Sequence, residues 1–226
     1  MRKNGKAVKY KGGDSMRAYQ NSLLDPSQVV IALIDHEPQM YFGVESDCRN
    51  AVLNAVIGLA KTAKAFNIPI ILSTVEANTF SGPLVNKVQS VFPDIVPIDR
   101  TTLNAWEDKN FKTAVQATKR KKLLLAGLWT EVCVTLPALS AMEDGYEIYA
   151  VADASAGSSK QTHQMAMQRL IQAGAKPVTW QATLLEMQRD WANKDTYQVV
   201  TDIIREHGGA YGLGLEYAST FIPQNN

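Results

Sequence analysis

An uninterrupted apolar run, Val-Val-Ile-Ala-Leu-Ile at residues 29–34, limits the possible folds of this 226-residue chain more than any other feature. A strand in a half-exposed antiparallel sheet alternates apolar and polar residues, whereas a strand covered on both faces of a parallel sheet is apolar throughout. Further strand-like runs occur at residues 70–74, 123–126, 145–153 and 176–180. We therefore predict a mostly parallel sheet that is covered by helices.

Segments with a helical spacing of apolar residues separate these runs. The clearest is residues 50–66, which the Asn-Ile-Pro sequence at 67–69 ends. Helices are also predicted at residues 84–91, 108–118, 138–143, 163–173 and 183–191. Because strands and helices alternate without an internal repeat, the predicted fold is a three-layer α/β/α sandwich around a doubly wound, mostly parallel sheet.

The two ends of the chain differ from its centre. Residues 1–25 are polar, carry five lysine or arginine residues before Gly12 and show no period, so we predict an N-terminal arm. Residues 26–195 are predicted to form a single α/β domain. Residues 196–226 are predicted to be a C-terminal helix and tail that packs on this domain or on a neighbouring subunit. The glycine-rich run at 208–214 is interpreted as flexible, because it lacks the flanking strand and helix of a phosphate-binding loop.

Composition argues against several classes of function. A net charge of +1 creates no long-range field of either sign, so neither nucleic acid nor a membrane surface is expected as a partner. No apolar run reaches the roughly 18 residues of a membrane span, and no apolar signal core follows the basic first residues. The two cysteines form no CxxC or Cys/His cluster for zinc. We expect a cytoplasmic protein that binds a small molecule and needs no metal or cofactor.

Asp35 and Cys133 stand next to two of the predicted strands. Asp35 directly follows the run at 29–34, and Cys133 follows the run at 123–126 through Gly127. Ligands of doubly wound sheets bind beyond the carboxyl ends of the strands. If a helix begins just before Cys133, its free N–H groups and positive dipole end are expected to lower the pKa of the thiol. Cys133 is then a candidate nucleophile, with a buried core cysteine as the alternative.

Arg100 adds a fixed positive charge to this pair. It follows a long loop at residues 76–99 that contains proline and glycine, and long loops in α/β proteins are often functional. In one site, Asp35 could take the proton of the Cys133 thiol while Arg100 holds both groups electrostatically. Taken singly, Asp35 remains open to a role as a helix cap and Arg100 to a role as a surface charge.

Other polar residues are interpreted as structural. Asp153 and Ser155 are predicted to cap the helix that follows them. His163 and His207 are expected on helices or at the surface, so neither is expected to serve as a base for the cysteine. The four charges at residues 119–122 are expected to face solvent.

The motifs around these residues resemble the isochorismatase-like cysteine hydrolase superfamily, and most closely its YcaC-like branch. The matching motifs are Ile-Asp-His at 34–36, Asn-Ala-Trp at 104–106 and Gly-Leu-Trp-Thr-Glu-Val-Cys-Val at 127–134. The likeness extends over residues 29–191. It implies an isochorismatase-like sandwich of Rossmann-like topology, in agreement with the pattern of strands and helices.

The resemblance implies a catalytic triad of Asp35, Arg100 and Cys133. It also implies a cis peptide bond between Leu128 and Trp129, which turns the backbone N–H groups of Trp129 and Cys133 toward a tetrahedral oxyanion. Most members of the superfamily carry lysine in place of Arg100, although YcaC-like members resemble this chain there. Because arginine stays protonated, Asp35 would have to carry out all of the proton transfer.

The implied function is hydrolysis of a small amide-like or related C–N bond by a homo-oligomer, with an octamer as one possibility. His36, Asn104 and Trp106 are predicted to line the substrate pocket. The aspartate and histidine metal site of nicotinamidases has no counterpart in residues 73–92, so no metal is expected. A non-catalytic oligomeric scaffold, or a thiol-sensing protein with the same fold, is the alternative.

Overall fold

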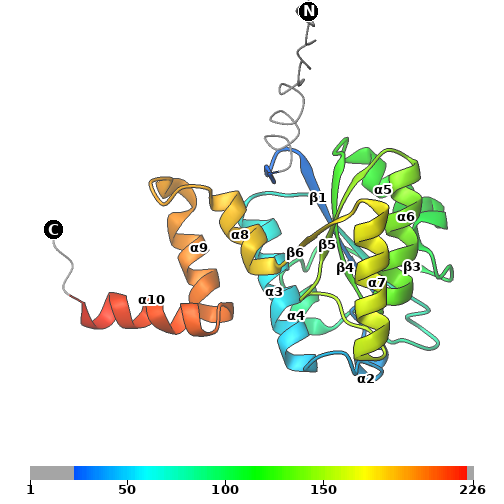
Figure 1. The fold of residues 1–226 in the computed structure, drawn as a ribbon, viewed down its shortest axis with the longest axis horizontal. Coiled ribbons are helices and arrows are strands. Elements are labelled where there is room, and N and C mark those ends of the chain that lie inside the picture. The colour runs from blue at the N-terminus through cyan, green and yellow to red at the C-terminus, as the bar shows by residue number, and fades with distance from the viewer. Residues whose placement is uncertain (1–22, 223–226) are drawn as a thin grey trace, which may run out of the picture.

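A parallel sheet of six strands forms the centre of the molecule (Figure 1). The computed structural model describes residues 23–222. In the sheet order β3-β2-β1-β4-β5-β6, the strands are β3 (Ile98–Arg100), β2 (Ile70–Val75), β1 (Val29–Ile34), β4 (Lys122–Gly127), β5 (Glu147–Val151) and β6 (Lys176–Val178). All five pairings are parallel, which confirms the predicted doubly wound sheet.

Helices cover both faces of this sheet (Figure 1). One layer contains α3 (Arg49–Ala65), α4 (Asn86–Gln89) and α8 (Trp180–Gln188), and the other contains α5 (Lys109–Ala117), α6 (Thr135–Glu143) and α7 (Lys160–Ala173). The remaining helical segments are α2 (Pro38–Phe42), the short turns η1 (Ala105–Glu107) and η2 (Thr130–Val134), α9 (Lys194–His207) and α10 (Ala210–Phe221). The three-layer α/β/α prediction is therefore confirmed.

The central strand β1 joins the two cores of the molecule. Val29, Ile31 and Leu33 face the layer of α3 and α8, whereas the alternate residues Val30 and Ala32 face the layer of α5 to α7. All six residues of β1 are buried, as its uninterrupted apolar sequence predicted. Burial on both faces makes β1 a rigid base for the residue that follows it.

The carboxyl ends of all six strands lie at one edge of the sheet, because every pairing is parallel. In the register, Ile34 at the end of β1 pairs with Ser73 of β2 and with Gly127 at the end of β4. Gly127 permits this close pairing, because a Cβ atom at this position would lie 2.7 Å from the carbonyl oxygen of Ile34. The segments that follow these strands are thus brought together at one edge.

The two ends of the described chain pack on the same domain. α9 contacts α3 and α8, and α10 contacts α9. The prediction that residues 208–214 are flexible was wrong, because most of them form the first turns of α10. Gly212 allows this packing, since a Cβ atom there would lie 2.5 Å from the carbonyl oxygen of Ile204.

Most of the predicted N-terminal arm, residues 1–22, lies outside the described residues. Its last part is anchored on α8, where the N–H of Leu24 donates to Glu186 Oε1 at 2.7 Å and its carbonyl accepts from Arg189 at 2.6 Å. Within residues 23–222, no helix has both the length and the apolar character needed to cross a membrane.

Candidate active site

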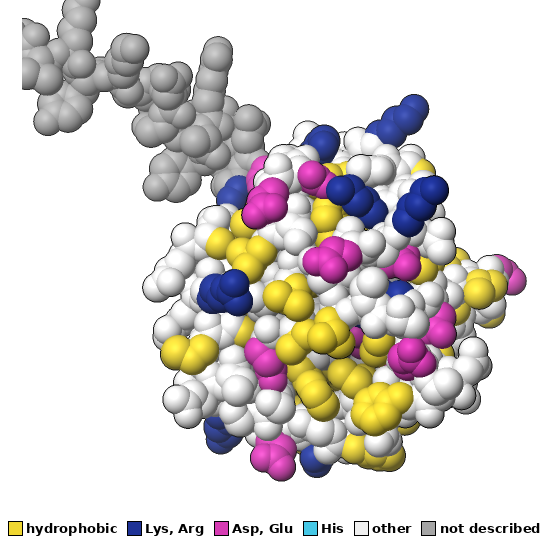
Figure 2. Space-filling view, turned by 90° about the vertical axis from the view of Figure 1, so that its right-hand side faces the viewer, with side chains coloured by type: hydrophobic (Ala, Val, Ile, Leu, Met, Phe, Trp, Pro, Cys, Tyr) yellow, Lys and Arg dark blue, Asp and Glu magenta, His cyan; other side chains and the backbone are white. Residues whose placement is uncertain are grey.

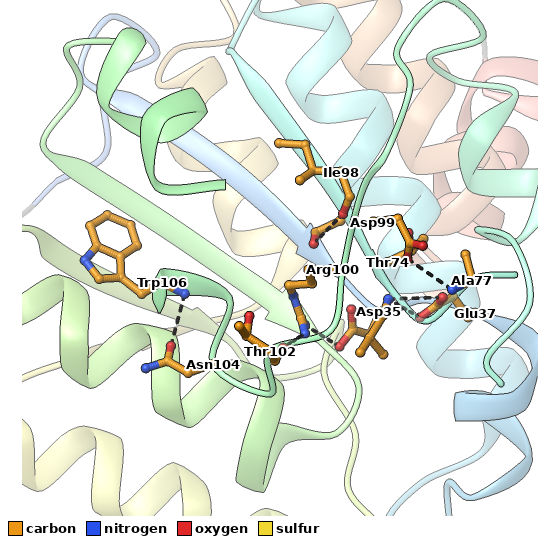
Figure 3. A network of polar contacts seen from close by, with 12 residues as sticks. Asp35, Glu37, Thr74, Ala77, Ile98, Asp99, Arg100, Thr102, Asn104 and Trp106 are labelled. Carbon is orange, nitrogen blue, oxygen red and sulfur yellow. Dashed lines mark hydrogen bonds and ion pairs between the residues drawn. The ribbon is translucent and has the colours of Figure 1, made fainter. Parts of the chain in front are cut away.

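Asp35 and Arg100 form a buried ion pair at the carboxyl edge of the sheet (Figure 3). Arg100 Nη2 donates to Asp35 Oδ2 at 2.6 Å, and neither side chain is exposed to solvent. Asp35 has a left-handed backbone conformation, with φ of 58°, and its N–H donates to the carbonyl of Ser73 at 2.9 Å. Strand β2 therefore fixes the backbone from which the Asp35 carboxylate projects.

Arg100 is the last residue of β3, a three-residue strand that the sequence analysis assigned to the end of a loop. Its backbone pairs with Val75 in the register, and its side chain also donates to the carbonyl of Thr102. A strand this short carries too few residues for its alternation to be recognised. Pairing with β2, which only the folded chain provides, turns Arg100 toward Asp35.

Cys133 lies in the π-helical turn η2, between β4 and α6, and its side chain is buried. The N–H groups of Val132 and Cys133 both donate to the carbonyl of Trp129, at 3.0 and 2.9 Å. The thiol of Cys133 interacts with the Asp35 carboxyl group. The structure thus brings together the three residues of the implied triad.

The pKa of Cys133 contradicts the expectation from a helix N-terminus. Burial raises the pKa of the thiol well above its usual range, and the negative charge of Asp35 raises it further. The Arg100 guanidinium and the N–H of Trp129 act in the opposite direction but do not compensate. The predicted lowering was wrong because desolvation of a buried thiolate outweighs the field of the turn.

Asp35 remains the stronger acid of the pair. Burial raises its pKa to about 6, although Arg100 and the Cys133 thiol partly offset this effect. At neutral pH the carboxylate is therefore mostly ionised and the thiol keeps its proton. Asp35 Oδ1 has no hydrogen bond of good geometry to any other described group. One oxygen thus pairs with Arg100 while the other is free to accept a proton.

The peptide bond between Leu128 and Trp129 is cis, at the position that the resemblance implied. The backbone N–H of Trp129 faces the Cys133 sulfur and stabilises its thiolate form. The N–H of Cys133 is instead bonded to the carbonyl of Trp129. Of the two N–H groups implied for an oxyanion site, one faces the sulfur and the other already has a partner.

Asn104 and Trp106, which were predicted to line the substrate pocket, are hydrogen-bonded to α6 and to the residue that follows it. Asn104 Oδ1 caps η1 by accepting from the N–H of Trp106 at 3.0 Å, and its Nδ2 donates to Ser140 Oγ at 3.0 Å. The Trp106 indole donates to Asp144 Oδ2 at 2.8 Å and packs edge-on against Tyr146. Figure 3 shows Trp106 well away from Asp35.

His36 was also predicted to contact substrate, but its side chain has no exposed surface. Its Nε2 lies 3.0 Å from the carbonyl of Ala154, and burial lowers the pKa of the imidazole to about 4. A neutral ring with Nε2–H donating to this carbonyl satisfies both observations. His36 therefore ties the segment after β1 to the segment after β5.

Asp153 and Ser155 are structural, as predicted, but they hold other elements than expected. Asp153 Oδ1 accepts from the N–H of Trp180 at 2.9 Å, at the start of α8. Ser155 Oγ accepts from the N–H of Gly127 at 3.2 Å. Ser159, not either of these residues, caps the helix α7 that follows.

Glu37 is a further buried residue of this edge that the sequence analysis did not single out. Its side chain is fully buried, and both of its carboxyl oxygens lie 3.3 Å from the N–H of Val75 (Figure 3). Burial, followed by the nearby charge of Asp35, raises its pKa to about 8. The signal in the sequence was a second carboxylate only two positions after Asp35.

The surroundings of the three residues are closed and contain no cluster suited to a metal. In residues 23–222, no group of three or more His, Cys, Asp or Glu side chains is placed to hold an ion. A cavity of about 830 Å³ lies between α3 and α9, and none of the triad residues lines it. We therefore do not assign this cavity to the chemistry of Cys133.

Comparison with known proteins identifies the family. A model of the isochorismatase domain matches residues 28–182. The chain belongs to the isochorismatase family. Within this family, it is 40% identical to the probable hydrolase YcaC of Escherichia coli (strain K12) over 171 residues. This match covers 75% of this chain and 82% of the E. coli protein. The chain thus falls in the YcaC-like branch of the isochorismatase family.

Two solved structures support this placement. One is YcaC from Pseudomonas aeruginosa with hexane-2,5-diol and covalent acrylamide. It matches with a TM-score of 0.84 and 33% identity, and the match covers 88% of this chain and 98% of the P. aeruginosa chain. The E. coli YcaC gene product, described as an octameric hydrolase of unknown specificity, has a TM-score of 0.83 and 36% identity, over 88% of this chain and 97% of that one.

Proposed function

We propose that the protein is a cysteine hydrolase that cleaves a small amide or a related C–N bond. The observation that carries this proposal is the buried cluster of Asp35, Arg100 and Cys133, which come from three separate segments of the chain. A thiol beside a carboxylate and a fixed cation can exchange its proton without a histidine. Membership of a hydrolase family supports a catalytic rather than a purely structural role for this cluster.

In the first step, Asp35 takes the thiol proton and the sulfur of Cys133 attacks the substrate carbonyl carbon. A C–S bond forms and the carbonyl π electrons move to oxygen. The N–H of Trp129, which lowers the pKa of the Cys133 thiol, is the donor that we propose for this oxyanion. When the intermediate collapses, the C–N bond breaks, and Asp35 returns the proton to the leaving nitrogen.

Water completes the reaction by hydrolysing the thioester. Asp35, again ionised, accepts a proton from the attacking water, and the C–S bond then breaks to release the acid. The proton returns to the sulfur, which restores the starting state. Arg100 keeps its own proton throughout and stabilises Asp35 in its ionised form.

A compact amide is the substrate class that fits the site best. Cys133 is only 3% exposed, so a large substrate could not reach its sulfur without displacing the segments around it. The P. aeruginosa relative contains a covalent acrylamide, which is a small primary amide. We therefore propose that acrylamide-sized amides reach Cys133 in this chain as well.

We also propose that the protein is a cytoplasmic homo-oligomer. The E. coli relative is described as an octameric hydrolase, and an octamer is the state that we propose here. Both cysteines of the chain, Cys48 and Cys133, are free thiols, which suits a reducing compartment.

The proposed function can be tested with the two cysteines as a matched pair. Ammonia release from a panel of small primary amides, and the mass of the protein after exposure to acrylamide, would be measured for wild type, Cys133→Ala and Cys48→Ala. We expect Cys133→Ala to lose ammonia release and to keep only an adduct on the exposed Cys48 thiol, and Cys48→Ala to keep turnover and the adduct on Cys133. Turnover that survives Cys133→Ala would refute the proposal, and a wild type that releases no ammonia and carries no adduct on Cys133 would favour the non-catalytic scaffold.

A further inference from the structure

Among residues 23–222, the carboxyl edge of the sheet contains two buried carboxyl groups, Asp35 and Glu37, but one buried guanidinium, that of Arg100. Arg100 is bonded to Asp35 at 2.6 Å, with neither side chain exposed. Glu37 follows two residues later, precedes the first turn of α2 and is equally buried. Figure 3 shows its carboxyl group near the ends of β1 and β2, on the side of Asp35 away from Arg100. A single guanidinium cannot neutralise both carboxylates.

The contacts of Glu37 are poor for a carboxylate. Among the described groups it accepts only from the N–H of Val75, and both oxygens share this donor at 3.3 Å. By comparison, Asp99 accepts from Thr74 Oγ1 at 3.0 Å and from the N–H of Ala77 at 3.1 Å, and is exposed. A buried carboxylate with one long hydrogen bond carries a large desolvation penalty, which protonation removes.

The charged groups around Glu37 also favour its protonated form. Asp35, which follows β1, and Asp99 on β3 oppose its ionisation, and Arg100 on β3 favours it. β2 contributes no ionisable side chain, and α2 contributes the Tyr41 phenol, whose pKa burial raises. The balance around Glu37 is therefore two carboxylates against one guanidinium.

We propose that Glu37 holds a proton beside the Asp35–Arg100 pair and that its charge state controls how readily the Cys133 thiol ionises. Glu37 is thus a positioning residue that acts through Asp35. While Glu37 is neutral, the pair of Asp35 and Arg100 has no net charge, and the thiolate meets no further repulsion. Once Glu37 ionises, a second negative charge beside Asp35 disfavours the thiolate. Its raised pKa, about 8, puts this change just above neutral pH.

Labelling of Cys133 measures this effect without requiring a substrate. The rate of iodoacetamide labelling at Cys133 would be followed by peptide mass spectrometry from about pH 6 to 9.5, in a Cys48→Ser background. Glu37→Gln keeps the shape and the acceptor for Val75 but cannot ionise. We expect equal rates in parent and Glu37→Gln at pH 6, and labelling about three- to tenfold faster in Glu37→Gln at pH 9.5, as a thiol pKa shift of about 0.5 to 1 unit requires.

Two further variants separate the electrostatic role from a structural one. Asp99→Asn removes an exposed carboxylate of the same edge and is expected to change the rate ratio much less. Glu37→Ala also loses the acceptor for the N–H of Val75. If the labelling rate changes because the local structure is disturbed, the change should be larger in Glu37→Ala than in Glu37→Gln at every pH. A constant Glu37→Gln to parent ratio from pH 6 to 9.5, or an equal change in Asp99→Asn, would overturn the proposal.

Thermal unfolding gives an independent readout. Because the folded pKa of Glu37 lies above its unfolded value, the folded state binds more protons between about pH 4 and 8 and loses stability as the pH rises through this window. Glu37→Gln should remove this loss, so its melting temperature relative to the parent should increase from pH 5 to pH 9. The proposal rests on Cys133 as the proposed nucleophile, but labelling tests Glu37 even if no amide is hydrolysed.

Discussion

At the scale of single residues, Asp35 has two opposite effects on Cys133. Its negative charge raises the pKa of the thiol, yet its free Oδ1 is the group that can remove the thiol proton. Thiol ionisation in the resting protein and proton transfer during the reaction should therefore respond differently to the loss of this carboxylate.

Asp35→Asn should separate these two effects. Without the negative charge the thiol pKa falls, so iodoacetamide should label Cys133 faster at pH 9 than in the wild type. Turnover of any amide substrate should fall at least about 10²-fold, because no general base remains. In the wild type, kcat/KM should rise with pH through about 6, where Asp35 ionises. Slower labelling in Asp35→Asn would contradict the effect of the Asp35 charge on the Cys133 thiol.

Arg100→Met should leave the Asp35 carboxylate buried without its ion-pair partner. The free energy of unfolding at pH 8 should fall by about 3–5 kcal/mol, as in other buried pairs that lose one member. At pH 5, Asp35 is mostly protonated, so the loss should be smaller. Urea unfolding at both pH values measures this, with Arg100→Lys as the charge-preserving control. An equal loss at both pH values would assign the effect to packing instead.

At the scale of elements, the approach of β1 and β4 determines where Cys133 lies. Both strands end at the paired residues Ile34 and Gly127, and the turn η2 begins three residues later. Thr130 then fixes this turn, since its N–H donates to Ala156 at 2.9 Å and its hydroxyl lies 2.8 Å from His163 Nδ1. A small change in the spacing of the strands would therefore move the sulfur.

Gly127→Ala tests this dependence on backbone spacing. The added Cβ would lie 2.7 Å from the carbonyl of Ile34, so the strands must separate. We expect a loss of about 1–3 kcal/mol in the free energy of unfolding, which is typical of overpacking. Gly214→Ala is a suitable control, because a Cβ atom in this α10 position meets nothing within 4 Å. Chemical denaturation of both variants measures the difference, and equal stability would contradict a tight β1–β4 contact.

At the scale of the whole molecule, apolar side chains remain on the surface. Leu213, Tyr217 and Phe221 of α10 are 74%, 60% and 70% exposed. A second apolar area lies on another face of the molecule. Figure 2 shows hydrophobic side chains across the middle of the face that lies to the right in Figure 1, whereas α10 lies to the left. Large exposed apolar areas are unusual for a monomer and favour the proposed association with further copies of the chain.

Size-exclusion chromatography with light scattering should therefore give a mass several times the 24.9 kDa of the chain. Leu213→Asp combined with Tyr217→Asp should reduce this mass, because both changes place a charge on the apolar surface of α10. Val96→Asp changes an 84% exposed residue in a loop and serves as the control. A wild-type protein that elutes as a monomer would remove the proposed homo-oligomer.

The sequence by itself determined the fold class, and it named Asp35, Arg100 and Cys133 as candidates for one site. Uninterrupted apolar strands require cover on both faces, and the edge at which parallel strands end follows from that topology. The tertiary structure decided what each side chain contacts. Asn104 and Trp106 are bonded to the α6 region, Glu37 joins the site, and burial raises the pKa of Cys133 instead of lowering it. Solvation and hydrogen bonding depend on segments that are distant in the chain, so local sequence patterns could not reveal them.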